Sequence, residues 1–169
     1  VSARYVRVEI TEWNTYPSMR VGVYVDSAVS MPTESVVVNP PDDRRSASSG
    51  EPHSMLDGLA TWTAASDEPE QWLQMDLGAV MDVKGVLLQH GHRTVGAQIH
   101  VDSAITKVKV QVGDSTDNMR DVPGGIFDTT KSTMSEVHGG IGRHLLEIGE
   151  ADVSLERHAE TDAADRSNV

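Results

Sequence analysis

The chain has 169 residues, a formal net charge of −12 and no cysteine. This length suits one domain with a tail, and the negative charge disfavours nucleic acid and anionic lipid, which bind clustered Lys and Arg. The absence of cysteine excludes a disulfide framework and a thiolate zinc site, and no apolar run is long enough to span a bilayer. We expect partners that are neutral, cationic or bridged by a metal ion.

The opening residues predict two half-buried β-strands, at 3–10 and 19–25. In the first, Val6, Val8 and Ile10 alternate with polar residues, and in the second, Met19, Val21, Val23 and Val25 do the same. The chain begins at Val1, without a starting methionine or a signal peptide. We therefore expect a processed or excised piece of a longer protein.

The following residues predict a linker and then further strands. Residues 28–43, in a stretch rich in Pro, Ser and Asp, are expected to form a linker or an irregular entry loop. Strand patterns follow at 71–77, 83–89 and 106–112. Short strands divided by Gly, Pro and Asp turns, with no long amphipathic helix, indicate an all-β fold, an antiparallel β-sandwich or jelly roll. The acidic residues 149–169 are interpreted as a solvated tail, with a single helix as the alternative.

Several of these segments resemble the discoidin domain, also called the coagulation factor V/VIII type C domain. Residues 57–65 (DGLATWTAA), 70–78 (EQWLQMDLG), 83–86 and 106–115 resemble the N-terminal and central parts of that family. Residues 3–25 resemble its C-terminal end. The resemblance implies a galactose-binding-domain-like β-sandwich whose parts occur here in rotated order.

Three arrangements would explain the rotated order. The three are a fragment of a tandem array, a circular permutation, and a subunit whose opening strands complete the sheet of a neighbouring copy. In the tandem case, residues 143–148 would be a degenerate copy of 3–8. The expected organisation is C-terminal-type strands at 1–27, the linker at 28–43, the main body at 44–148 and the tail at 149–169.

The resemblance implies a non-catalytic binding module, lectin-like or adhesive, at the cell surface or outside the cell. Its loops at one end of the sandwich would bind carbohydrate or a protein, and the alternative is a structural subunit joined to other copies by strand exchange. No P-loop, HExxH or GxSxG motif suggests an enzyme. Lipid binding is disfavoured because the loop after Ser48 offers only Met55 and Leu56, in an acidic protein. The candidate ligand-binding residues are Tyr16, Arg44, Arg45, His53, His90, His92, Arg93 and Gln98.

Two of these features have alternative interpretations. The other aromatic residues all lie in scaffold motifs, and Tyr16 does not. It is either a stacking platform for a sugar or a turn residue before Pro17. His90 and His92, with His100 nearby, are either solvated loop histidines or ligands of a transition metal.

A calcium ion is a further expectation from the resemblance. In carbohydrate-binding modules similar to this family, an Asp-Gly turn and a following Thr before Trp hold calcium, and Asp57, Gly58 and Thr61 match that pattern here. Such a turn supplies the oxygen ligands that calcium prefers. The family's glutamate on the final strand has no counterpart, because Arg20 stands near that position. The alternative is that Asp57 only caps its own turn.

Overall fold

The structure is a computed structural model, and it describes residues 1–26, 35–91, 93–95, 98–100, 104–138 and 141–149. For 93–95, 98–100, 133–138 and 141 the description covers the backbone alone. Within these ranges, no helix is long and apolar enough to cross a membrane. The elements are β1 (Ser2–Asn14), β2 (Ser18–Asp26), β3 (Ser35–Val38), η1 (Asp42–Arg44), β4 (Arg45–Ala47), β5 (Trp62–Thr63), β6 (Trp72–His90), β7 (Arg93–Val95), β8 (Gln98–His100), β9 (Ala104–Gly113), β10 (Arg120–Asp128), η2 (Thr129–Lys131), β11 (Thr133–His138) and β12 (Ile141–Glu147).

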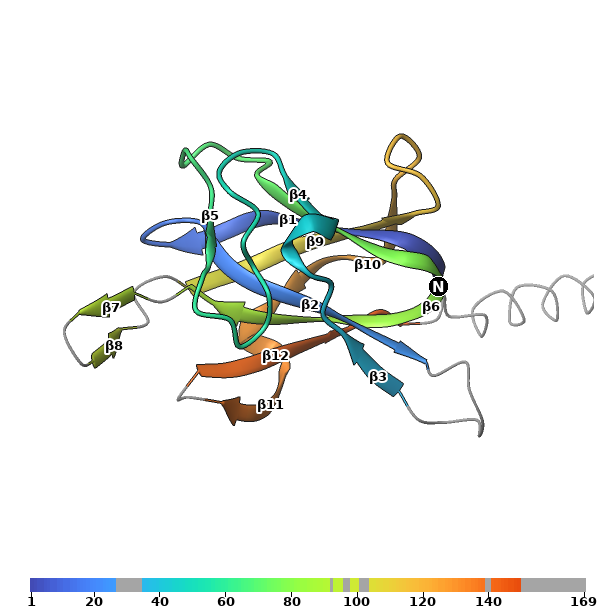
Figure 1. Cartoon of the computed structure of the whole chain (residues 1–169). Coiled ribbons are helices and arrows are strands. Elements are labelled where there is room, and N and C mark those ends of the chain that lie inside the picture. Colours follow the sequence, from blue (N-terminus) through green and yellow to red (C-terminus); the bar gives the residue numbers. More distant parts are fainter. Residues whose placement is uncertain (27–34, 92, 96–97, 101–103, 139–140, 150–169) are drawn as a thin grey trace, which may run out of the picture.

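The strands form two layers that share the long strand β6 (Figure 1). The first half of β6 pairs with β1 and β4, and β1 pairs in turn with β9, which pairs with β10. The second half pairs with β2 on one side and with β12 on the other, and β12 pairs with β11. All of these pairs are antiparallel, which confirms the predicted all-β antiparallel fold.

The core lies between the two layers and takes one face of each strand. Val6, Val8 and Ile10 of β1 are completely buried, as are Val108 and Val110 of β9. Each side chain of this size that leaves water contributes about 1.5–3 kcal/mol. In β1 the predicted alternation is therefore the alternation between core and surface. In β2 the expected half-burial is wrong, because the face opposite the core is covered too: Arg20 is only 3% exposed.

The two opening strands enter different layers and pair with other strands of the chain rather than with each other. Val8 of β1 lies opposite Leu73 of β6 on one side and opposite Val110 of β9 on the other. Strand β2 continues into the second layer, where Val21 lies opposite Leu88. The opening residues thus supply a central strand to each layer.

Two expectations about single segments are corrected by the strand pairing. Residues 35–38, expected in the linker, form β3, because Val36, Val37 and Val38 pair with β2. The segment proposed as a copy of β1 takes a different place: Leu146 of β12 lies opposite Val86, in the layer of β2. The expected tail falls outside the described residues from position 150 onward.

The two strands expected at 71–77 and 83–89 are one bent strand. The register between β1 and β6 slips between the pairs Tyr5–Asp76 and Ala3–Met81, which marks a bulge. Gly78 lies in this bulge with a φ of +84°, a conformation that disfavours residues with a side chain. The bulge lets β6 pass from one layer to the other.

Candidate functional site

The turn between β1 and β2 lies at one end of the sandwich (Figure 1), and Tyr16 is one of its residues. Thr15 takes a positive φ of 71°, and the Tyr16 backbone N–H donates to the Asn14 carbonyl at 2.9 Å. The Tyr16 residue itself is half-buried. The tight turn therefore sets the backbone position of Tyr16 relative to the ends of β1 and β2.

Two other segments meet this turn. The Ala64 N–H donates to the Pro17 carbonyl at 3.0 Å, and the Gly91 N–H donates to the Ser18 carbonyl at 3.1 Å. The Thr63 hydroxyl adds a hydrogen bond of 3.0 Å to the Ser18 hydroxyl. We call residues 14–18, 63–70 and 90–91 the loop end. Its outermost part is acidic, since Asp67, Glu68 and Glu70 are exposed.

His90 lies at the inner border of the loop end, partly inside the protein. Its Nδ1 accepts a hydrogen bond of 3.2 Å from the Ile105 N–H, and its ring centroid is 4.6 Å from that of His144. Burial, and secondarily His144, lowers the pKa of His90 to about 4. Burial also lowers the pKa of His144, whose Nδ1 lies 2.8 Å from the Ser132 hydroxyl. His90 is therefore neutral at neutral pH.

Three other predicted ligand residues gather around the 3₁₀ turn η1 instead. Arg44 is exposed, and His53 Nδ1 lies 2.8 Å from Asp42 Oδ2. Arg45 is only 6% exposed, and its guanidinium donates five hydrogen bonds, to the Pro40 and Val21 carbonyls, to the carbonyl and hydroxyl of Ser54, and to Asn39 Oδ1. Arg45 thus ties together segments of the protein alongside the middle of β2, at some remove from Tyr16.

Two of the remaining predicted ligand residues lie in the short strands β7 and β8. His92 lies outside the described residues. Arg93 in β7 and Gln98 in β8, together with His100, belong to a short hairpin in which Arg93 lies opposite His100. For these three residues the description covers the backbone only.

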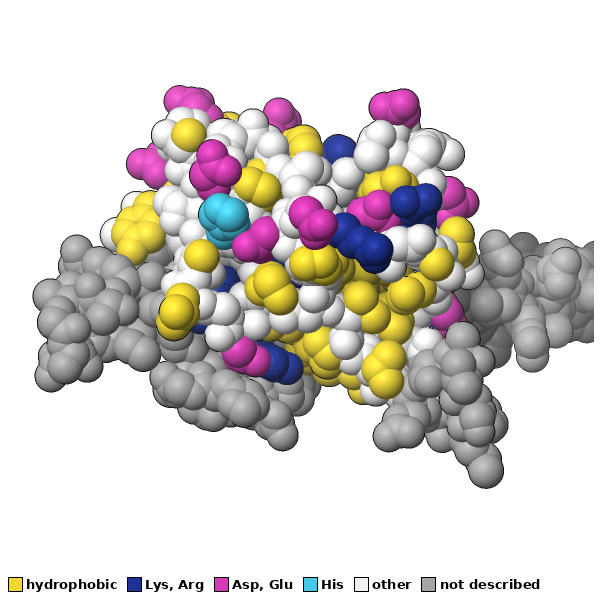
Figure 2. All heavy atoms as spheres, viewed as in Figure 1, with side chains coloured by type: hydrophobic (Ala, Val, Ile, Leu, Met, Phe, Trp, Pro, Cys, Tyr) yellow, Lys and Arg dark blue, Asp and Glu magenta, His cyan; other side chains and the backbone are white. Residues whose placement is uncertain are grey.

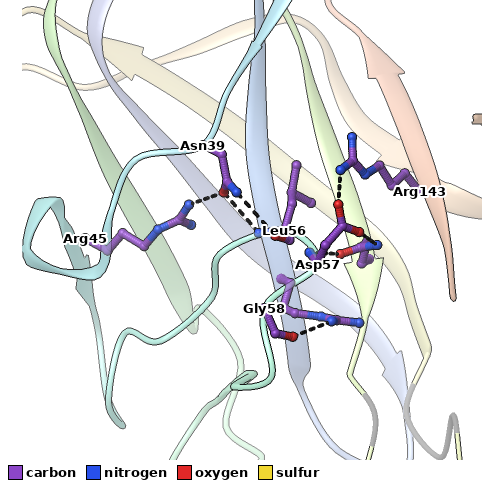
Figure 3. A network of polar contacts seen from close by, with 8 residues as sticks. Asn39, Arg45, Leu56, Asp57, Gly58 and Arg143 are labelled. Carbon is purple, nitrogen blue, oxygen red and sulfur yellow. Dashed lines mark hydrogen bonds and ion pairs between the residues drawn. The ribbon is translucent and has the colours of Figure 1, made fainter. Parts of the chain in front are cut away.

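The predicted calcium residues lie on a loop that crosses the outer face of the β2, β6 and β12 layer (Figures 1 and 3). Asp57 has a φ of 59°, and the Gly58 N–H closes a turn onto the Met55 carbonyl at 3.1 Å. The Asp57 N–H donates to Gln89 Oε1, and Gln89 Nε2 donates back to Asp57 Oδ1, both at 2.8 Å. Asp57 Oδ2 accepts from Arg143.

Side chains from the body hold this loop along its length. Arg20 Nη1 donates to the Gly58 carbonyl at 2.8 Å. Asn39 binds both backbone groups of Leu56, accepting from its N–H at 3.0 Å and donating to its carbonyl at 3.2 Å (Figure 3). The Thr61 hydroxyl is buried without a hydrogen-bond partner among the described residues.

Sequence reasoning missed Gln89, Asn39 and Arg143 as partners of the loop. Gln89 carried a usable signal, because it is a polar residue that directly follows the apolar run Val86–Leu88. The structure buries it completely. A buried amide needs hydrogen-bond partners. Arg143 carried no such signal, since its contact with Asp57 depends on the register of strands that are distant in the sequence.

An apolar hollow of about 330 Å³ lies toward the other end of the molecule. It is lined by Val25, Asp26, Val36, Val38, Val80, Met81 and Asp82. Figure 2 shows hydrophobic side chains gathered over this region of β2 and β3. The predicted site residues do not line it.

Comparison with known proteins identifies the family. The family model described as F5/8 type C domain matches residues 37–142. The comparison with curated proteins and the comparison with solved structures gave no match. The matched range covers the second half of β3, β4 to β11 and the start of β12, while β1 and β2 lie before it.

Proposed function

Because this chain belongs to the F5/8 type C, or discoidin, family of binding modules, we propose that it is a non-catalytic module that binds carbohydrate through its loop end. Domains of this family are generally non-enzymatic and typically extracellular or at the cell surface. Cell-surface adhesion of the lectin type is the role that fits such a module.

The observation that carries this proposal is the placement of Tyr16. Most other aromatic residues serve the scaffold: Trp62 is completely buried, Trp13 and Phe127 pack against the core, and Trp72 and Tyr5 lie against the guanidinium groups of Arg7 and Arg4 at 4.2 and 5.2 Å, while Tyr24 is a half-buried residue within β2. Tyr16 instead stands on the tight turn where three chain segments meet. A tyrosine on such a turn offers a ring on which a sugar can stack.

The charge of the loop end favours a glycan over a lipid surface. Exposed Asp67, Glu68 and Glu70 offer acceptors for sugar hydroxyls, whereas anionic headgroups would be repelled. Among the described residues, the exposed large hydrophobic side chains are Val36, Val37, Leu59, Val80 and Ile126. None of these lies in the loop end.

Binding to a glycan array tests this proposal. We expect the wild-type protein to bind a subset of glycans, Tyr16→Ala to lose about 10-fold in affinity, which corresponds to ~1.4 kcal/mol, and Tyr16→Phe to keep most of it. His53→Ala is the matched control, since His53 is exposed beside η1. A wild-type protein that binds no glycan, or a Tyr16→Ala variant that binds as tightly as wild type, would contradict the proposal.

A second candidate is a structural subunit that joins copies by strand exchange. It is favoured by the central position of β1 and β2, which lie before the matched family range and yet pair with β6 and β9. The same strand pairs would form if β1 and β2 entered the sandwich of a neighbouring copy. Concentration-dependent sizing distinguishes the two candidates, because exchange predicts assemblies larger than one chain.

A further inference from the structure

Three adjacent strands each direct one polar side chain at the Asp57–Gly58 turn. Arg20 comes from β2, Gln89 from β6 and Arg143 from β12, which lie in the order β2–β6–β12. Arg20 is opposite Gln89, and His144 is opposite Leu88, so Arg143 is level with Gln89 across the strands. The register therefore places the three residues in a row across the strands, and Figure 3 shows Arg143 directed at Asp57.

Two of these side chains are cations shielded from water. Arg20 is 3% exposed and the Arg143 side chain 17%. Burial lowers the pKa of Arg20, and the negative charge of Asp57 opposes that shift. The Arg20 Nε and Nη2 atoms and the Arg143 Nε atom have no hydrogen-bond partner among the described residues. The charge of Asp57 is thus the main compensation for two poorly solvated guanidinium groups.

The oxygens of this turn do not fit a calcium ion. Calcium takes six to eight oxygen ligands at 2.3–2.6 Å, yet Asp57 Oδ1 and Oδ2 and the Gly58 carbonyl already accept from Gln89, Arg143 and Arg20. An ion on the Gly58 carbonyl would lie within roughly 5 Å of the Arg20 guanidinium, at which like charges repel. Of the predicted calcium ligands, only the Thr61 hydroxyl has no hydrogen-bond partner in the described part of the chain. The described residues contain no group of three or more His, Asp or Glu that could hold a metal.

We infer that Arg20 and Arg143 take the place of a divalent cation at this turn and hold the loop without calcium. The Asp57 carboxylate and the Gly58 carbonyl are close together and need positive charge beside them. The Arg143 and Arg20 guanidinium groups supply it. This role explains why Arg20 stands near the position of the family's glutamate. A glutamate in place of Arg20 would leave the negative charge of Asp57 without that compensation. This inference does not depend on which ligand the loop end binds.

Thermal unfolding with and without calcium tests the inference on the full chain. We expect the melting temperature of the wild-type protein to be the same in millimolar CaCl₂ and in EDTA, and calorimetric titration with CaCl₂ to give no binding heat. A rise in melting temperature with calcium that EDTA reverses, or saturable binding by calorimetry, would overturn the inference.

Substitution of Arg143 tests the positive part of the inference. We expect Arg143→Gln to lower the melting temperature by about 5 °C and to speed amide hydrogen exchange at residues 55–61, with Arg143→Lys intermediate. The matched control is Arg4→Gln, which removes an Arg–Asp pair on a more exposed surface, where Arg4 donates to Asp76. If Arg143→Gln does not fold, exchange in Arg143→Lys serves as the readout. Exchange at 55–61 that equals that of the Arg4→Gln control would contradict the role of Arg143.

Discussion

Arg45 shows how a charged side chain can be part of the interior. It joins the loop at residues 39–40, strand β2 and Ser54 by five hydrogen bonds, while burial lowers its pKa to about 10. A pKa of that size leaves the guanidinium charged at neutral pH. Its planar fork of donors matches acceptors on several sides at once, which a lysine ammonium does not.

Replacing Arg45 by Lys tests this structural role. We expect the free energy of unfolding to fall by about 3 kcal/mol, because the charge stays buried while several of its hydrogen bonds are lost. Urea unfolding of Arg45→Lys measures the change, with Arg44→Lys at the neighbouring exposed position as control. Equal midpoints for the two variants would contradict the role assigned to Arg45.

His90 makes stability depend on pH. Its pKa is lowered in the folded protein from 6.5 to about 4, so between these values the unfolded chain binds a proton that the folded protein does not. The stabilisation is complete above pH 6.5 and is lost as the pH falls toward 4. After a discount for partial exposure, the loss is about 2 kcal/mol.

The melting temperature as a function of pH measures this effect. We expect His90→Gln to show a smaller decrease than wild type between pH 7 and pH 4.5, because glutamine does not titrate and can still accept from the Ile105 N–H. His53→Gln is the control, since His53 is exposed. Parallel curves for wild type and His90→Gln would show that another group causes the acid sensitivity.

At the scale of strands, Gly85 lies in β6 where β2 and β12 flank it on both sides. It lies opposite Tyr24 of β2 and opposite Glu147 of β12. A Cβ atom at this position would be 2.6 Å from the Leu146 carbonyl oxygen, which belongs to the backbone and has little room to move. The glycine therefore allows β12 to pair closely with β6.

Gly85→Ala should separate β12 from β6. We expect a loss of about 1–3 kcal/mol in the free energy of unfolding and faster amide exchange in residues 144–147. Gly149→Ala is the matched control, because nothing lies within 4 Å of a Cβ atom there. A Gly85→Ala protein as stable as the control would mean that the strands adjust at no cost.

The strands differ in how far their sequence predicts them. The alternation in β1, β2 and β9 predicts both the strand and its buried face, because each presents one face to the core. It does not predict the partner strand, the bend at Gly78 that joins two expected strands into β6, or the pairing of the three consecutive valines of β3. The contacts of Asp57 with Gln89 and Arg143 depend on which strands lie side by side, so the local sequence cannot predict them.

For the molecule as a whole, the two candidate functions differ in whether β1 and β2 pair within their own chain in solution or with a neighbouring copy. Glu9 of β1 and Lys109 of β9 are opposite each other, and their side-chain charges are 3.9 Å apart. Opposed residues in antiparallel strands have Cα separations that a disulfide can bridge. The chain has no cysteine of its own, so an introduced pair has no competing thiol.

A disulfide between positions 9 and 109 tests the pairing directly. We expect the double variant Glu9→Cys and Lys109→Cys to oxidise to a cross-linked monomer on a non-reducing gel, at all protein concentrations. Mixing the two single variants should give no dimer linked between positions 9 and 109. A ladder of cross-linked chains would instead support the strand-exchanged subunit.

The central place of β1 also sets the order in which this protein can assemble. Val8 and its partner Val110 are 102 positions apart (110 − 8), and pairs this remote in sequence slow folding because a long chain must close first. On the ribosome, β1 must wait for β6 and then for β9 before both of its edges are paired. In that interval the nascent strand displays Val6, Val8 and Ile10 to the solvent, where chaperones recognise such surfaces.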